Sequence, residues 1–338
     1  MSNKKILVTG GAGYIGAHTV IELIQAGYEP IIIDDFSKSD HTLLNGIEKL
    51  TTRRPEFIEG NCLDRDFLRL VFKEHQFSSV IHFAAYKSVG ESVQKPLTYY
   101  HNNIDSLISL LEIMEEYKVK NFIFSSSCTV YGQPDQIPVD ENAPFKRAES
   151  PYGATKQMCE RILEDSYLTG FRIVSLRYFN PIGAHPSAQL GELPIGTPNN
   201  LVPYITQTAI GKRDKLTVFG NDYDTPDGSC VRDFIHVVDL AIAHLKAMEY
   251  LDKQAGDVFY DVFNVGTGVG VSVLELIDKF QKSTGVKLNY TIGPRRPGDV
   301  EKTYADSSKV NNILDWKAKY TIEEALLHAW KWEGKLAR

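Results

Sequence analysis

The sequence has few cysteines and no excess of positive charge, and each of these scarcities excludes a class of protein. Its 338 residues include only four cysteines, Cys62, Cys128, Cys159 and Cys230. None forms a Cys-x-x-Cys pair of the kind that holds zinc or performs dithiol chemistry, so we expect reduced, buried thiols and no metal site. The 37 basic and 43 acidic residues give a net charge of −6, which is the wrong sign for coating nucleic acid or an anionic membrane.

Long apolar runs are also missing. No stretch approaches the roughly 18 uninterrupted apolar residues of a membrane-spanning helix, and the first residues pass directly into the short apolar segment 6–8 without a signal-peptide pattern. The 43% of hydrophobic residues and 24% of charged residues are typical of a folded globular protein. We therefore expect a cytoplasmic protein of about two domains, with no membrane and no nucleic-acid partner.

What is present is an alternation of strand and helix patterns. Residues 6–8 form a short apolar run, residues 18–26 have helical spacing, and residues 30–34 are again strand-like, which together indicate a βαβ unit. The alternation continues at residues 80–84, 104–117 and 122–124. This pattern predicts an α/β protein with a doubly wound parallel sheet covered by helices on both faces.

The pattern changes after Asn180. Residues 181–200 contain four prolines and show little periodicity, which favours either a domain boundary or an active-site loop. Regular structure is expected to resume at residues 201–210.

Three glycines, Gly10, Gly13 and Gly16, stand between the first strand and its helix. Such a loop allows a tight turn and a close approach of backbone N–H groups to a pyrophosphate, although glycines also gather in turns for conformational reasons alone. Asp34 strengthens the functional interpretation, because it ends the second strand 18 residues after Gly16, where a carboxylate accepts hydrogen bonds from a ribose. A carboxylate there repels a 2′-phosphate, so the pattern predicts NAD rather than NADP.

Ser127, Tyr152 and Lys156 form a candidate catalytic group. Ser150 and Pro151 are typical of a helix start, which puts Tyr152 and Lys156 on one helix face. An ammonium at roughly 5 Å lowers a phenol's pKa by about two units in an effective dielectric near 20, and an oxidised nicotinamide adds to the effect. Tyr152 is then a credible general base, and Ser127 can donate to the substrate oxygen. Each piece alone is also common in structural helices and turns.

Several motifs resemble the extended short-chain dehydrogenase/reductase family, and in particular its sugar-nucleotide epimerases. They are the glycine loop at residues 8–16, Val-Gly-Glu-Ser-Val at 89–93, Phe-Ser-Ser-Ser at 124–127, Val-Tyr-Gly at 130–132, Ser-Pro-Tyr-Gly at 150–153, Arg-Tyr-Phe-Asn-Pro at 177–181 with Gly-Ala-His-Pro at 183–186, Val-Arg-Asp at 231–233 and Gly-Asp at 298–299. The resemblance covers nearly the whole chain. It implies a Rossmann-type NAD-binding domain over residues 1–180, to which later segments at about 230–265 cross back, and a smaller α/β domain over residues 181–338 that mainly binds a UDP-sugar.

The resemblance also implies which residues contact NAD. They are Gly10, Gly13, Tyr14, Ile15, Gly16, Asp34, Asp35, Phe36, Ser37, Lys38, Ser39, Asn61, Cys62, Phe83, Ala84, Ala85, Tyr86, Lys87, Asn102, Ser127, Tyr152, Lys156 and Phe179. At Asn61 the family usually has aspartate, and this departure puts one adenine hydrogen bond in doubt because an amide also donates.

For the UDP-sugar, the resemblance implies arginines that bind the diphosphate, since a guanidinium does not deprotonate. The implied residues are Ser127, Tyr152, Asn180, Asn200, Thr217, Val218, Phe219, Arg232, Arg296, Asp299 and Thr303. Phe219 is expected to cover the uracil. For any single arginine, a surface ion pair is the simpler interpretation.

The implied reaction is the NAD-dependent inversion of carbon 4 that interconverts UDP-glucose and UDP-galactose in galactose metabolism. The relatives also suggest that the enzyme is a homodimer. Thr303 replaces a bulky tyrosine found in relatives confined to these two sugars, so N-acetylated UDP-sugars are a further candidate substrate. Cys128 and Thr129 stand where dehydratases of the family carry an acidic pair. The alternatives are another UDP-sugar oxidoreductase or dehydratase of this fold, and a non-catalytic NAD-binding sensor.

Overall fold

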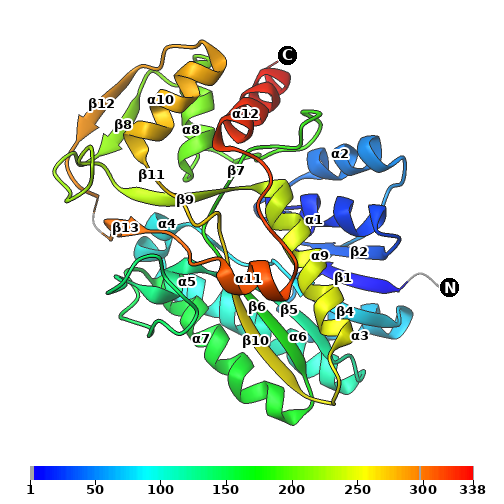
Figure 1. The fold of residues 1–338 in the computed structure, drawn as a ribbon. Coiled ribbons are helices and arrows are strands. Elements are labelled where there is room, and N and C mark those ends of the chain that lie inside the picture. Colours follow the sequence, from blue (N-terminus) through cyan, green and yellow to red (C-terminus); the bar gives the residue numbers. More distant parts are fainter. Residues whose placement is uncertain (1–3, 297, 338) are drawn as a thin grey trace.

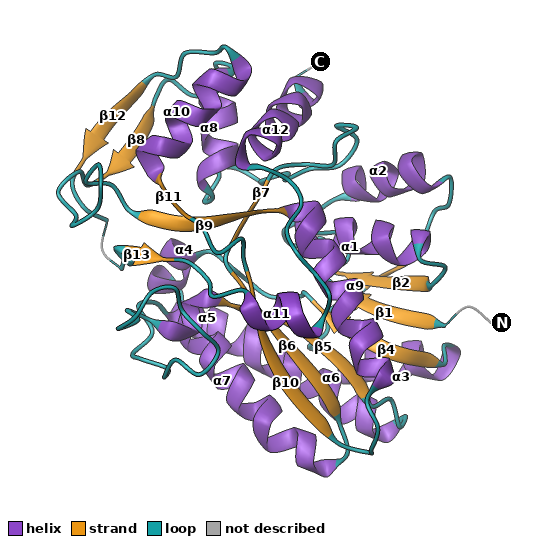
Figure 2. Ribbon diagram, viewed as in Figure 1, coloured by secondary structure: helices purple, strands orange, loops and turns teal. Residues whose placement is uncertain are grey.

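The larger part of the protein is a seven-stranded sheet with helices on both faces (Figure 1 and Figure 2). The computed structural model describes residues 4–296 and 298–337. All neighbouring strands of this sheet run parallel, which confirms the doubly wound parallel sheet predicted from the sequence. In spatial order the strands are β10 (Phe259–Val265), β6 (Arg172–Tyr178), β5 (Asn121–Ser127), β4 (Phe77–His82), β1 (Lys5–Thr9), β2 (Glu29–Asp34) and β3 (Glu56–Glu59).

Two hydrophobic cores lie on the two faces of this sheet. Along β1, Ile6 and Val8 pack into one core and Leu7 into the other, because successive side chains of a strand point to opposite faces. Both faces are buried, so the strand is a continuous apolar run. The first core includes helices α1 (Tyr14–Gln25), α2 (His41–Thr51) and α9 (Val237–Lys253), and the second includes α3 (Arg65–Glu74), α6 (Ser106–Glu116) and α7 (Pro151–Ser166).

The strand order places a crevice between β1 and β4. From β1 the chain builds β2 and β3 on one side, then crosses to build β4, β5 and β6 on the other side. Ligands of open parallel sheets bind outside the carboxyl ends of the strands at such a switch point. The segments that follow β1, β4 and β5 therefore face one site.

The remaining chain forms a smaller α/β unit, whose elements α8, α10, β8 and β12 lie together at one end of the molecule in Figure 1. Its long strand β9 (Val231–His236) pairs with β7 (Asn180–Ile182), β11 (Gly270–Ser272) and β13 (Lys302–Thr303). A separate parallel pair joins β8 (Leu216–Phe219) to β12 (Tyr290–Gly293). Helices α8 (Leu201–Ala209), α10 (Val273–Thr284) and α12 (Ile322–Leu336) share a third core with these strands.

Some boundaries differ from the sequence interpretation. Strand β5 continues through Ser127, so the serines at 125–127 belong to the strand and not to a turn after it. The helix expected at 104–117 begins earlier, as the π-helical turn η1 (His101–Asp105), before it continues as α6.

The remaining helical elements are short. They are α4 (Val89–Gln94), α5 (Pro96–Tyr100), the 3-10 turns η2 (Cys128–Tyr131) and η3 (Tyr167–Thr169), and α11 (Ser308–Ile313). The division into domains at residue 180 stays a prediction.

Candidate active site

The glycine loop has the close packing that a phosphate cradle requires. Gly10 has a φ of +69°, and a Cβ there would lie 2.7 Å from the backbone nitrogen of Ala84. A Cβ on Gly16 would lie 2.4 Å from the carbonyl oxygen of Gly10. Helix α1 begins after Gly13 without a side-chain cap, so its first N–H groups are available to an anion. The loop therefore fits the pyrophosphate of a dinucleotide.

Asp34 closes this loop from the end of β2. Its carboxylate accepts hydrogen bonds from the backbone nitrogens of Ala12 and Phe36, both at 3.1 Å, and from the Ser39 hydroxyl at 2.7 Å. Burial raises the pKa of Asp34, and these three donors act in the opposite direction. A carboxylate fixed beside the loop matches the position expected for a ribose contact. The neighbouring expected residues Ser37 and Lys38 lie on the same segment, where Lys38 pairs with Glu91 at 3.6 Å.

The unusual Asn61 has a structural partner. Its amide nitrogen donates to Asp35 at 2.9 Å, and its oxygen accepts from the backbone of Leu63 at 2.8 Å. An aspartate could not donate to Asp35, so the amide avoids a contact between two carboxylates. Beside it, burial raises the pKa of the Cys62 thiol to about 12, which fits a packing residue and not a nucleophile.

The segment after β4 is held by an asparagine that the sequence interpretation missed. The Asn103 side chain accepts from the backbone nitrogen of Tyr86 at 2.8 Å and donates to the Tyr86 carbonyl at 3.0 Å. It also donates to Thr155 on α7, and Asn102 donates to it at 3.0 Å. The π-helical turn that carries both asparagines is a feature often found at functional sites. Asn103 thus connects residues 83–87, expected at the cofactor, to the helix of Tyr152.

Ser127, Tyr152 and Lys156 come together at the carboxyl end of β5. Ser127 is the last residue of this strand, and Ser150 caps α7 by accepting from the backbone of Gly153 at 3.2 Å. The Lys156 ammonium donates to the Ser125 carbonyl at 2.6 Å and lies 5.9 Å from the centre of the Tyr152 ring. All three catalytic candidates are buried. The helix start predicted from Ser150 and Pro151 is confirmed.

The protein's own groups do not lower the pKa of Tyr152 as the sequence interpretation expected. Burial raises that pKa, the neighbouring Tyr178 adds to the rise, and the nearby Ser127 side chain acts in the opposite direction. Burial also lowers the pKa of Lys156 to about 8. The ammonium that was expected to lower the pKa of Tyr152 donates to a carbonyl of β5 and packs on Phe124, 4.7 Å from that ring's centre. A sufficiently acidic Tyr152 therefore needs a further positive charge in the site.

Arg177, the first residue of the Arg-Tyr-Phe-Asn-Pro motif at 177–181, has a structural role. Its guanidinium binds the Glu160 carboxylate through Nε at 2.9 Å and through Nη2 at 2.6 Å, and both side chains are buried. Ser126 also donates to Glu160. This pair fixes β5, β6 and α7 against one another, next to Lys156.

The two arginines expected at the diphosphate converge on one carboxylate. Asp299 binds Arg296 at 2.6 Å and lies 3.8 Å from Arg232. Phe219, with 42% of its surface exposed, lies under the Arg296 guanidinium at 5.6 Å from the ring centre. By contrast, the adjacent Arg295 is directed to Asp222 and Tyr223. The cluster of Phe219, Arg232, Arg296 and Asp299 thus assembles residues from three separate segments: β8, β9 and the loop that carries both Arg296 and Asp299.

The other expected substrate residues border this cluster or the crevice. Thr303 is buried and pairs in register with Arg232. Thr217 and Val218 precede Phe219 on β8, and Asn180 begins β7 directly after the buried Phe179. Asn200 stands at the start of α8, where its amide donates to Glu192 at 2.6 Å. Pro297, which precedes the Gly-Asp motif, lies outside the described residues.

The described residues contain neither a candidate membrane-spanning helix nor a candidate metal-binding cluster. Over residues 4–296 and 298–337, no helix combines the length and apolar character needed to cross a membrane. Within the same residues, no three histidine, cysteine or acidic side chains are grouped in a way that could hold a metal ion.

Comparison with known proteins decides the family. A family model described as GDP-mannose 4,6 dehydratase matches residues 7–328. The UDP-glucose 4-epimerase of Bacillus subtilis is 48% identical over 331 residues, 97% of this chain and 96% of that protein. A solved epimerase from Stenotrophomonas maltophila, with bound NAD and formylated UDP-arabinopyranose, superposes with a TM-score of 0.96 at 44% identity over 99% of both chains. The epimerase from Bifidobacterium longum, in complex with NAD+ and UDP, gives a TM-score of 0.95 at 44% identity over 98% of both.

The chain belongs to the UDP-glucose 4-epimerase family.

The description of the family model, GDP-mannose 4,6 dehydratase, differs from the names of the epimerase relatives, and the residues after Ser127 bear on this difference. The residues after Ser127 are Cys128 and Thr129, which begin the 3-10 turn η2. Neither supplies the acidic pair that dehydratases place there. Burial raises the pKa of the Cys128 thiol to about 12, which fits a packing residue and not a nucleophile.

Proposed function

We propose that this chain is an isomerase that inverts carbon 4 of a UDP-hexose, interconverting UDP-glucose and UDP-galactose with bound NAD. The observation that carries the proposal is the convergence of Ser127, Tyr152 and Lys156 at the carboxyl edge of the sheet, the edge that also carries the glycine loop, in a chain 48% identical to a curated epimerase. Inversion of carbon 4 through a ketone requires both a hydride carrier that stays bound and a base for the 4-hydroxyl. The site contains residues suited to both tasks.

The protein's part of the reaction is proton transfer and positioning. Tyr152 takes the proton of the 4-hydroxyl and returns it, while Ser127 donates a hydrogen bond to the same sugar oxygen. Lys156 supplies positive charge and anchors α7 to β5 through the Ser125 carbonyl. NAD, when bound, supplies a hydride acceptor that serves as the donor in the return step. Because inversion requires both faces of the sugar to be presented, the site must hold the nucleotide firmly and the hexose loosely.

The residues around the crevice fit both ligands. The uncapped start of α1 and the Gly10–Gly16 loop suit the NAD pyrophosphate, and Asp34 suits an unphosphorylated ribose. Lys87 adds a cation beside Tyr14, 6.0 Å from its ring centre. For the UDP-sugar, Arg232 and Arg296 supply cations for the diphosphate and Phe219 an exposed ring for the uracil.

We also propose that N-acetylated UDP-sugars are accepted. Thr303 is fixed by the backbone pairing of β13 with Arg232 on β9. A threonine at that position leaves a volume comparable to an acetamido group where relatives limited to glucose and galactose have tyrosine.

A single incubation tests the main proposal. Purified protein is mixed with UDP-galactose without added cofactor, and the products are separated. We expect UDP-glucose to form with no steady change in absorbance at 340 nm, because no net oxidation occurs. Accumulating NADH would show a net oxidoreductase, a 4-keto-6-deoxy product would show a dehydratase, and NAD binding without any product would favour the sensor.

The homodimer expected from relatives and the cytoplasmic location are further proposals. Three exposed apolar side chains, Val93, Leu97 and Met158, lie on the neighbouring helices α4, α5 and α7, and Leu97 is 80% exposed. Burying such a surface in a second copy is favourable. Sedimentation velocity tests the dimer, and Leu97→Glu is expected to shift it toward monomer.

The cytoplasmic location is supported by the thiols. All four cysteines are free, which fits a reducing compartment.

A further inference from the structure

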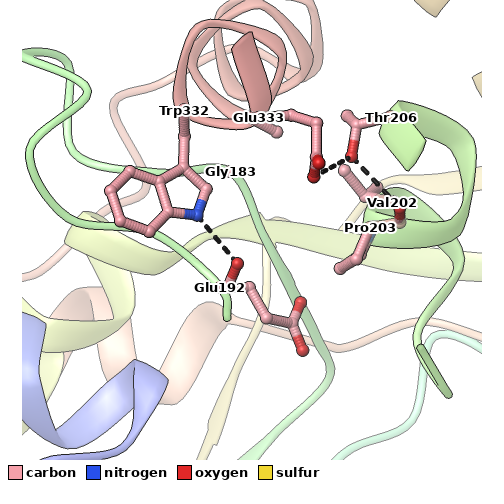
Figure 3. A pocket seen from close by; sticks show the side chains of 8 residues that line it. Gly183, Glu192, Val202, Pro203, Thr206, Trp332 and Glu333 are labelled. Atoms are coloured by element: carbon pink, nitrogen blue, oxygen red, sulfur yellow. Dashed lines mark hydrogen bonds between the residues drawn. The ribbon is translucent and has the colours of Figure 1, made fainter. Parts of the chain in front are cut away.

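Glu192, which the sequence analysis did not single out, is held on a fixed backbone between the two parts of the protein. The Trp332 indole nitrogen donates to its carbonyl oxygen at 2.8 Å (Figure 3). The preceding Gly191 forms a bridge with Ala184, and a Cβ on Gly191 would lie 2.5 Å from the Trp332 ring. In Figure 3 the Glu192 carboxylate points away from the Glu333–Thr206 contact on the far side of the pocket. The backbone therefore presents this side chain in one direction.

The carboxylate contacts one candidate residue from each ligand site. Its Oε1 accepts a hydrogen bond from the Asn200 amide at 2.6 Å and from the Lys87 ammonium at 3.3 Å. The Glu192 side chain is only 12% exposed, whereas Lys87 is 55% exposed. Its charge also extends to Tyr14, whose pKa is raised first by burial and then by Glu192.

Asn200 differs from most asparagines that stand at the start of a helix. Asparagine at the start of a helix commonly caps it by accepting from a backbone N–H. Asn200 occupies that position in α8 but makes no side-chain cap, and its amide nitrogen donates to Glu192. The Asn200 side chain is therefore held by Glu192 and not by the backbone of α8.

We propose that Glu192 is a positioning residue that acts as an internal anion shared by the two nucleotide sites. It orients Asn200 and occupies Lys87, the donors that the family resemblance assigns to the UDP-sugar and to NAD. An anionic ligand must then compete with this carboxylate and bind against its charge. Glu192 thus weakens nucleotide binding while keeping the donors in place, which suits an enzyme that must release a UDP-sugar in every cycle. The inference rests on the proposed function.

The test measures UDP affinity by isothermal titration calorimetry on the protein as purified. Glu192→Gln keeps an acceptor for Asn200 but removes the charge, so we expect it to bind UDP at least about fivefold more tightly than wild type, since removing a nearby like charge favours an anion. Glu192→Ala removes both, and we expect it to bind UDP less tightly than Glu192→Gln. A merely structural role would weaken binding in both variants.

The control variant is Asp257→Asn, which removes a charge from an exposed pair with Lys120 and should leave the UDP affinity within about twofold, as expected for a screened surface charge. Glu192→Gln that binds UDP no more tightly than wild type would overturn the inference, as would Glu192→Ala that matches or exceeds Glu192→Gln. If the Glu192 variants give either of these results while the wild type converts UDP-galactose, the inference fails and the proposed function stands. Wild-type protein that neither binds UDP nor converts UDP-galactose would overturn both.

Discussion

The cofactor crevice and the sugar-nucleotide cluster are built in opposite ways. In the crevice, short continuous segments such as Gly10–Gly16 and Tyr152–Lys156 carry most of the chemistry, and one turn or one helix fixes their geometry. In the cluster, Phe219, Arg232 and Asp299 come from different strands and loops, and only the folded chain brings them together. We therefore expect single changes in the crevice to abolish a step, and single changes in the cluster to weaken binding by degrees.

The largest expected effect is that of Tyr152→Phe. Removing the phenol hydroxyl removes the proton carrier and little else, so we expect turnover to fall by about 10² to 10⁴-fold, the usual contribution of a general base. Bound NAD, measured after denaturation, and UDP affinity should stay near wild type. Near-normal turnover would exclude Tyr152 from the mechanism and make the crevice as tolerant as the cluster.

Arg296→Gln tests the cluster. Loss of one charge-assisted contact is expected to weaken UDP binding by about tenfold or more, since such contacts contribute about 1.5–3 kcal/mol, while turnover at saturating substrate stays close to wild type. The matched control is Arg295→Gln, because the neighbouring Arg295 is exposed and paired with Asp222 outside the cluster. Equal losses of affinity in the two variants would show a general effect of charge, and would contradict a specific diphosphate site.

The preference for NAD over NADP tests the role of Asp34 in the cofactor crevice. We expect wild-type protein stripped of cofactor to regain activity with NAD and not with NADP, and Asp34→Asn to reduce this preference by about tenfold, because the repulsion of a 2′-phosphate is lost. Both cofactors are compared by the fraction of sites occupied after reconstitution. Equal occupancy of the wild type by NAD and NADP would show that the carboxylate faces another group.

The smallest effect on the main reaction is expected from Thr303→Tyr. We expect turnover of UDP-galactose to change by less than about threefold, whereas turnover of UDP-N-acetylglucosamine should fall at least about fivefold, because a larger side chain refills the volume beside Arg232 and overpacking is poorly tolerated. The two substrates are compared at the same enzyme concentrations. If neither protein converts the N-acetylated sugar when UDP-galactose is fully converted, Thr303 does not open the site.

The sequence by itself determined the architecture of the crevice. Alternating apolar runs predicted the parallel sheet, and Ser150 and Pro151 predicted the start of α7, because these features depend on neighbours along the chain. The Tyr152–Lys156 spacing on one helix face could be predicted for the same reason. The family motifs added the residues of the cluster one by one, without showing how they meet.

Only the tertiary structure decided the electrostatics and the long-range contacts. Burial raises the pKa of Tyr152, where local spacing alone predicted a lower value. The Asn61–Asp35 contact explains a departure from the family pattern, and the shared contact of Glu192 with Lys87 and Asn200 joins segments 105 and 8 residues away in sequence. Such features depend on the low dielectric of a closed interior and on which distant side chains the folded chain brings together, and neither is encoded in the spacing of residues along the chain.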